Sequence, residues 1–207
     1  MKAILALEDG TLFEGTSIGV GGEVVGDVVF TTAMSGFQEC LTDPSYHGMI
    51  LSFTDPIVDN YGVNGEDFES DAVQCVGVVM KDPSDTPSNF RCTGTMPDFL
   101  AKHKVVGIKD IDTRMLTRHL RDNGTMKGMI STDENFDFAK KVALIKAAKV
   151  TRPLEAVAAK KVAEYGEADE KGRRVALIDL GVKNSFIRTL TAEGLHVTRF
   201  PASAQWD

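Results

Sequence analysis

The segment from residue 174 to residue 200 has the pattern of a parallel β-α-β unit. The run RVALIDLG is a continuous apolar strand that ends at Gly181, and strands of this kind are buried on both faces of a parallel sheet. KNSFIRTLTAEG then predicts a helix that ends at Gly194, and LHVTRF predicts the next strand. Because parallel strands need a crossover connection, this order is the opening of a doubly wound fold.

Two strands and one helix form too small a unit to be stable alone. Ordering roughly 35 residues costs about 50 kcal/mol at ~1.5 kcal/mol per residue. Offsetting that cost takes roughly 2,000 Å² of buried apolar surface. We therefore expect the unit to belong to a longer protein, to pack against the preceding part of the chain, or to be poorly ordered.

The first 150 residues predict a mixed α/β domain. AILALEDGTLFEG predicts two strands around a turn at Asp9–Gly10. The glycine-rich stretch 19–26 lacks the G-x-G-x-x-G spacing, so it predicts a turn between strands and not a phosphate loop. Further strands are predicted over 27–34, 47–56, 71–80 and 104–110. Helices are predicted over 97–103, 111–124, 134–148 and 154–165.

The charged stretch 166–174 contains two glycines and almost no apolar residue, which is typical of a linker. We therefore divide the chain into a first domain over 1–150, a helical and charged linker over 151–172, and an incomplete second domain over 173–207.

Composition and charge exclude several classes of function. The net charge of -7 and the lack of any basic stripe argue against nucleic-acid binding. No apolar run has the length of a membrane span. The apolar run at the N-terminus is too short for the hydrophobic region of a signal peptide. Three cysteines without a C-x-x-C pattern fit a cytoplasmic protein with reduced thiols. The four histidines are scattered singly, so no metal site is predicted.

The stretch ECLTDPSYH contains Cys40, Ser45 and His47, which are side-chain types that hydrolases use. Glu39 precedes Cys40 directly, and a neighbouring carboxylate raises the pKa of a thiol, so we expect Cys40 to be a core or interface residue. His47 could pair with Ser45 on an extended chain, but no G-x-S-x-G elbow is present and we expect an exposed histidine. An independent Cys40–His47 hydrolase site stays as a weaker hypothesis.

The helix predicted over 111–124 has an apolar side formed by Met115, Leu116 and Leu120. Its other side carries Arg114, Arg118 and Arg121. Three arginines on one helix indicate either a solvated face or a contact with a protein partner, and the sequence leaves both open.

Five blocks, in order along the chain, resemble the small subunit of glutamine-dependent carbamoyl-phosphate synthetase. The combination of G-F-Q-E, L-T-D-P-S-Y and I-D-T-R-x-L-T-R is highly specific, because no single requirement of a fold would select all three. The blocks are 28–50, 55–64, 88–91, 105–130 and 175–190, and the resemblance covers essentially the whole chain.

This resemblance implies a two-part subunit. The N-terminal part is a mixed β/α domain of the swivelling β/β/α-like type that contacts the large synthetase subunit. The C-terminal part is a class I glutamine amidotransferase domain that hydrolyses glutamine to glutamate and ammonia. The large subunit joins the ammonia to bicarbonate with ATP and magnesium, which makes carbamoyl phosphate for arginine or pyrimidine synthesis. The resemblance implies no cofactor bound to this chain itself.

The family's catalytic residues have no counterpart in this sequence. Its nucleophile is a cysteine in a G-x-C-x-G-x-Q turn, supported by a histidine, a glutamate and an N-G-P-G-D-P oxyanion loop. We therefore expect no catalytic residue here and no glutamine hydrolysis by this chain. The alternative is a stand-alone, non-catalytic binding or scaffold domain of the same ancestry.

Ser45 is the one residue for which the resemblance implies a substrate contact. In the family, the serine of L-T-D-P-S-Y reaches bound glutamine from the N-terminal domain. A hydroxyl group suits this task because it both donates and accepts hydrogen bonds. From the residues alone, the default is a turn serine after Asp43–Pro44.

The sequence also departs from the family pattern. Thr31 and Ala33 stand where asparagine and serine are usual, and Phe37 replaces a common tyrosine. Residues 57–59, Ile-Val-Asp, replace His-Ile-Gly. We therefore do not expect the local hydrogen bonds around these loops to match those of the family.

Overall fold

A computed structural model describes residues 1–151, 153–167 and 172–205. In this part of the chain, seven strands close into a barrel with the order β1-β2-β8-β6-β4-β3-β9. The strands are β1 (Lys2–Leu7), β2 (Leu12–Gly19), β3 (Glu23–Thr31), β4 (Ile50–Phe53), β6 (Gly77–Val79), β8 (Val106–Lys109) and β9 (Met126–Ser131). The mixed α/β class predicted for the first domain is therefore confirmed.

The barrel combines antiparallel and parallel pairs. The predicted hairpin at Asp9–Gly10 is confirmed, because β1 and β2 pair antiparallel on either side of it. β9 then closes the barrel between β1 and β3. Strands β3, β4, β6 and β8 form a continuous parallel run. Parallel strands end at the same edge of a sheet, so the segments that follow β4, β6 and β8 meet at one side of the barrel.

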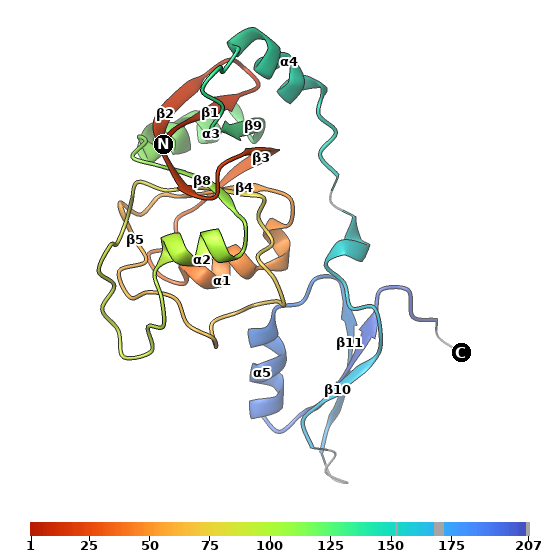
Figure 1. Cartoon of the computed structure of the whole chain (residues 1–207). Helices are drawn as coiled ribbons and strands as arrows, with labels where there is room; N and C mark the ends of the chain where they lie inside the picture. The colour runs from red at the N-terminus through yellow and green to blue at the C-terminus, as the bar shows by residue number, and fades with distance from the viewer. Residues whose placement is uncertain (152, 168–171, 206–207) are drawn as a thin grey trace.

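Alternate residues of the strands pack into two different cores, as the period of two requires. Ile50 and Val79 belong to one core, which also contains Leu116 and Leu120 of helix α3 (Thr113–Asn123). The neighbouring Leu51 and Val78 belong to the second core. Helices α1 (Phe37–Thr42) and α2 (Met96–Lys102) pack there, on the other side of the barrel (Figure 1).

Helix α3 follows the predicted bounds, but its apolar side is narrower than predicted. Leu116 and Leu120 are buried, whereas Met115 is 50% exposed. At about 100° per residue, the direct neighbour of Leu116 turns away from the core. Helix α4 (Phe138–Ala147) matches the helix predicted over 134–148, and Ile145 is its fully buried residue.

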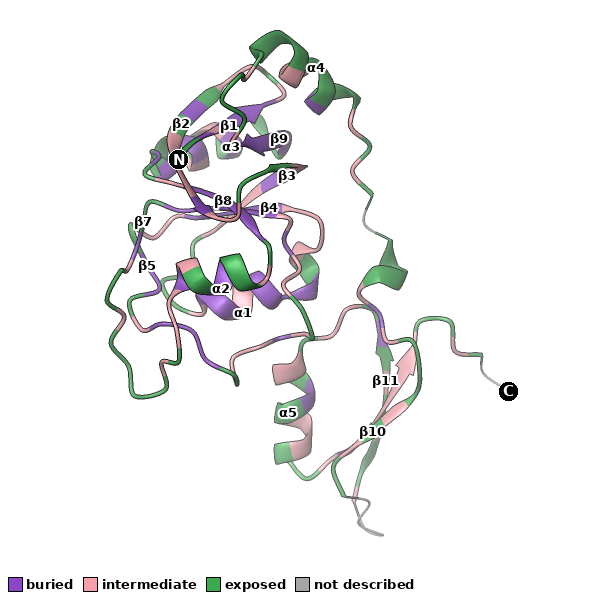
Figure 2. Ribbon diagram, viewed as in Figure 1, coloured by how far each residue is buried: buried purple, intermediate pink, exposed green. Residues whose placement is uncertain are grey.

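The predicted β-α-β unit is present at the C-terminal end. β11 (Arg174–Asp179) and β12 (His196–Pro201) pair in parallel and are joined by α5 (Asn184–Ala192). The expectation that β11 is buried on both faces is wrong in this structure, because residues 174–178 alternate between exposed and partly buried and only Asp179 is buried (Figure 2). We predicted that this unit is the first part of a doubly wound domain, and this stays a prediction.

The helix predicted over 154–165 is wrong. Residues Leu154–Ala156 form a single 3-10 turn, η2, and Ala163–Tyr165 form strand β10, which pairs antiparallel with β12. The three-stranded sheet has the order β10-β12-β11, so this segment contributes to the C-terminal unit. Residues 152 and 168–171 of the predicted linker lie outside the described residues. The division at 150 and 173 stays a prediction.

The shorter elements depart from the predictions in extent. Of the strand predicted over 71–80, only 77–79 has strand geometry. β5 (Ile57–Val58) and β7 (Asp82–Pro83) form a separate two-stranded pair, and η1 (Pro44–Tyr46) is a 3-10 turn. Strand β9 was not predicted, because no alternation of apolar and polar residues distinguishes MKGMIS. The turn predicted over 19–26 is shorter in the structure: it covers residues 20–22, because Gly19 ends β2 and residues 23–26 belong to β3.

Candidate functional site

Ser45 lies in the 3-10 turn η1 that follows helix α1, where Asp43 acts as the N-cap. The Asp43 Oδ1 atom accepts hydrogen bonds from the backbone N–H of Ser45 at 2.9 Å and from its hydroxyl group at 2.8 Å. The Ser45 side chain is exposed. Its hydroxyl proton is therefore held by Asp43, which leaves the hydroxyl oxygen of this exposed residue able to accept a hydrogen bond from a ligand.

The same aspartate ties this turn to the C-terminal unit. The second carboxylate oxygen of Asp43 lies 2.6 Å from the Lys183 ammonium group, which immediately precedes α5. Asp43 is buried, and its carboxylate raises the pKa of Lys183. One buried carboxylate thus orients the Ser45 hydroxyl and also pairs with a cation from the other unit.

A second contact joins the barrel domain to the start of α5. The backbone N–H of Ser185 donates to the buried Glu69 carboxylate at 2.8 Å, and the N–H of Asn184 donates to the Glu69 carbonyl at 2.9 Å. The N-cap residue of α5, Lys183, supplies no side-chain cap. The barrel domain therefore supplies the negative charge that a helix N-terminus favours.

Gly181 is a third point where the two units pack closely. A Cβ atom at this position would lie 3.2 Å from Cβ of Pro44 and 3.1 Å from a Val157 methyl group, and the backbone φ is +100°. Next to this contact is a shallow groove of about 300 Å³. Its lining includes Ser45 and His47 from the barrel domain and Leu154 and Leu180 from the C-terminal unit. Ser45 thus faces a groove between two units of the chain.

The structure does not bring Cys40 and His47 into one site. The Nδ1 atom of His47 lies 2.9 Å from the Gln74 side-chain oxygen, and no described hydrogen bond joins His47 to Cys40 or to Ser45. Burial raises the pKa of the half-buried Cys40 thiol, and the Asp43 and Glu39 carboxylates raise it further. This environment disfavours the thiolate form that a nucleophile requires.

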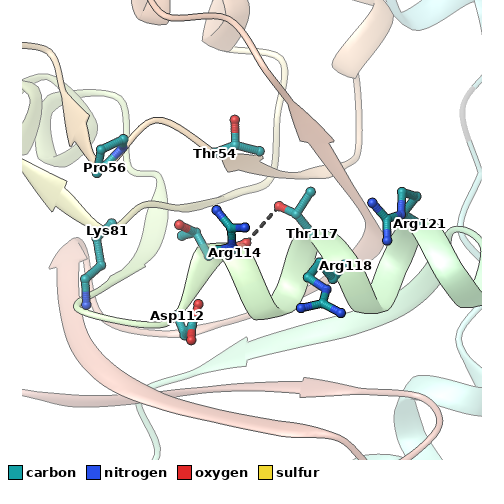
Figure 3. A pocket seen from close by; sticks show the side chains of 9 residues that line it. Thr54, Pro56, Lys81, Asp112, Arg114, Thr117, Arg118 and Arg121 are labelled. Atoms are coloured by element: carbon teal, nitrogen blue, oxygen red, sulfur yellow. Dashed lines mark hydrogen bonds between the residues drawn. The ribbon is translucent and has the colours of Figure 1, made fainter.

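A second candidate site is a cleft beside α3, which brings the three predicted arginines together (Figure 3). The cleft has a volume of about 810 Å³ and also contains Lys81 and Thr54. Sequence reasoning found the arginines from their helical spacing. It missed Lys81 and Thr54 because they follow different strands, β6 and β4, and no local pattern links them to the helix.

The described residues contain no cluster of three or more His, Cys, Asp or Glu side chains placed to hold a metal ion. Within the same residues, no helix has both the length and the apolar character needed to cross a membrane.

Comparison with known proteins settles the family. A model described as "Carbamoyl-phosphate synthase small chain, CPSase domain" matches residues 5–130, which is more than half of the chain. The chain belongs to the carbamoyl-phosphate synthase small-chain family. The residues matched span the barrel up to Ile130 in β9 and include both Ser45 and the arginine helix.

Curated relatives in the carbamoyl-phosphate synthase small-chain family extend the likeness to the C-terminal unit. The small chain of Clostridium perfringens is 43% identical over 202 residues, which cover 97% of this chain and 56% of the relative. The small chain of Thermotoga maritima is 44% identical over 209 residues, which cover 100% of this chain and 53% of the relative. The chain therefore spans about half the length of the curated relatives it matches.

Proposed function

We propose that this chain is the non-catalytic portion of a glutamine-hydrolysing subunit of carbamoyl-phosphate synthase. In this proposal Ser45 contacts the glutamine substrate, and the barrel domain docks onto the large synthetase subunit, which uses ATP and magnesium. A cytoplasmic location belongs to the same proposal. Membership in the small-chain family supports it, and so does the likeness to relatives named carbamoyl phosphate synthase small chain.

The position of Ser45 is the observation that carries the proposal. Its hydroxyl group is exposed at a groove between the two units and is oriented by Asp43, which Lys183 of the second unit anchors. A hydroxyl group held in this way accepts a hydrogen bond from the α-amino group of an amino acid. Such a contact binds and orients a substrate without reacting with it.

The cysteines support a non-catalytic role for this portion. The Cys75 thiol is fully buried and its pKa is raised to about 12, while burial also raises the pKa of Cys40. Neither thiol has the depressed pKa that activates a cysteine nucleophile. We expect the purified chain to release no ammonia from glutamine in a coupled glutamate dehydrogenase assay. Thiol-dependent release of ammonia would contradict the proposal.

The substrate contact is tested in a chimera that joins this chain to the remaining part of the Clostridium perfringens relative. We expect Ser45→Ala to raise KM for glutamine by about tenfold, since one hydrogen bond to a charged group contributes about 1.5 kcal/mol. Synthesis from free ammonia should not change. Ser88→Ala, at an exposed serine of the barrel domain, is the matched control. An unchanged KM for Ser45→Ala would contradict the assigned contact.

The alternative of a stand-alone scaffold domain stays a hypothesis, and an arginine cleft open to a protein partner is compatible with both. The alternative predicts binding of a protein partner without any effect of glutamine. Co-elution of the chain with the large synthetase subunit in gel filtration supports the proposed function over this alternative.

A further inference from the structure

The arginine cleft lies where the parallel strands of the barrel end. Thr54 directly follows β4, Lys81 lies two residues beyond β6, and α3 begins shortly after β8. β4, β6 and β8 are parallel neighbours, so their carboxyl ends meet at this edge of the barrel. In open α/β sheets, the carboxyl ends of parallel strands are the usual place for a binding crevice.

The cleft concentrates positive charge in a chain whose net charge is -7. Arg114, Arg118 and Arg121 follow one another at spacings of four and three along α3, so they lie on adjacent turns (Figure 3). Lys81 adds a fourth cation beside the first turn of this helix. Like charges at such spacings destabilise an isolated helix slightly, and an anion bound beside them would relieve this repulsion.

These cations have few internal partners. Among the ion pairs between described residues, none involves Lys81, Arg114 or Arg118, and Arg121 pairs only with the adjacent, exposed Asp122. The one carboxylate in the lining, Asp112, accepts the Met115 backbone N–H at 2.8 Å as the N-cap of α3. The guanidinium groups are thus exposed and available to an external anion.

Apolar side chains beside the cleft indicate the class of that anion. Pro56 lines the cleft, its neighbour Ile57 is 55% exposed, and Met115 is 50% exposed on the same helix. Arginine and methionine beside exposed apolar groups are typical of protein interfaces. None of the nine lining residues is a glycine, whereas phosphate sites usually use glycine-rich turns that present backbone N–H groups.

We propose that the arginine cleft is a docking surface for a partner protein segment that carries clustered carboxylates next to apolar side chains. Each guanidinium group can bind one carboxylate through two parallel hydrogen bonds, which fixes the register of the partner. This inference rests on the proposed function, because it names the face by which the barrel domain holds the large synthetase subunit.

The test compares charge-reversed variants in binding to the purified large synthetase subunit by isothermal titration calorimetry. We expect Arg114→Glu/Arg118→Glu to weaken binding by at least about tenfold, because like charges across an interface repel strongly. Arg173→Glu/Arg174→Glu reverses two exposed arginines on the C-terminal unit and should leave the affinity unchanged. Thermal unfolding of each variant separates a loss of binding from a loss of folding, and Arg114→Gln/Arg118→Gln provides a milder second variant.

A second arm does not depend on the large subunit. A fluorescent peptide of alternating glutamate and leucine is titrated against the chain, and we expect binding that weakens with salt and is lost in Arg114→Glu/Arg118→Glu. If the wild-type chain binds this peptide but not the large subunit, the proposed function fails while the docking surface stands. If the cleft variants bind both partners as well as the wild type does, the arginine cleft is not the docking surface. Tighter binding of tripolyphosphate than of the peptide would also overturn the inference.

Discussion

Asp59 is a buried aspartate at a backbone position that favours glycine. Its φ is 62°, its side chain is fully buried, and neither carboxylate oxygen has a hydrogen-bond partner of normal geometry among the described residues. Burial, with a smaller contribution from the nearby Glu39 carboxylate, raises its pKa to about 7, although the Met96 N–H has the opposite effect. At this one residue the chain accepts both a conformational and an electrostatic cost.

The raised pKa of Asp59 predicts that the stability of the folded chain depends on pH. The unfolded chain releases the Asp59 proton near pH 3.8, whereas the folded chain retains it to about pH 7. The folded state therefore binds more protons between these values, so Asp59 lowers the free energy of unfolding as pH rises from about 4 to about 7. We expect Asp59→Asn to raise Tm by at least about 2 °C at pH 8 and to have a much smaller effect at pH 4.

The control for this measurement is Asp71→Asn, at an exposed aspartate of the same domain. Its effect on Tm should be similar at pH 4 and pH 8. Equal effects of Asp59→Asn at both pH values would show that the Asp59 proton is not linked to folding. Asp59→Gly should stabilise as well, because glycine adopts a positive φ without strain.

At the scale of single elements, α5 depends on a residue outside its own unit. The four N–H groups at a helix start need acceptors, and the Lys183 side chain offers none, although its carbonyl accepts the Phe186 N–H at 3.1 Å. Glu69 accepts from Ser185 through its carboxylate and from Asn184 through its carbonyl. The helix is therefore capped through tertiary contact, and its local sequence contains no capping signal.

We expect Glu69→Ala to destabilise α5 by about 1–2 kcal/mol, since it removes both a cap and a charge favourable to the helix dipole. Hydrogen exchange should accelerate over residues 184–192 and remain unchanged in the barrel strands. Glu66→Ala, at an exposed glutamate nearby, serves as the control. Unaltered exchange in α5 would mean that Glu69 does not stabilise the helix start.

At the scale of the whole molecule, several contacts between described residues join the barrel domain to the C-terminal unit. They include the Asp43–Lys183 ion pair, the cap from Glu69, and the approach of Gly181 to Pro44. A connecting segment after α4 runs along the outside from one unit to the other (Figure 1). The groove that contains Ser45 exists only while these contacts hold the units together.

Two glycine substitutions separate backbone strain from the loss of this junction. Gly181 and Gly194 both have positive φ, but only Gly181 has neighbours within 4 Å of an added Cβ. We expect Gly194→Ala to cost about 1 kcal/mol through strain alone. Gly181→Ala should cost more and should accelerate hydrogen exchange over residues 43–46. Equal costs and unchanged exchange at 43–46 would show that the units do not depend on this contact.

Several features were predictable from the sequence because their causes are local. The Asp9–Gly10 turn sets the first hairpin, apolar spacing sets the position of α3, and glycines end α5 and the strand before it. The β-α-β unit followed from the same signals. The family motifs also led to Ser45, although its contact with glutamine stays a prediction.

Other features depend on residues far apart in the chain, and only the tertiary structure decided them. Residues 163–165 follow a stretch with good helix formers, yet they form a strand because β12 supplies their hydrogen-bond partners. Lys81 and Thr54 join the arginines because parallel strands end at one edge of the barrel. By itself the sequence determined local turns, helix faces and the family. The packing of the barrel, and its contacts with the C-terminal unit, decided which distant groups share a site. That packing brings separate segments of the chain within hydrogen-bond distance.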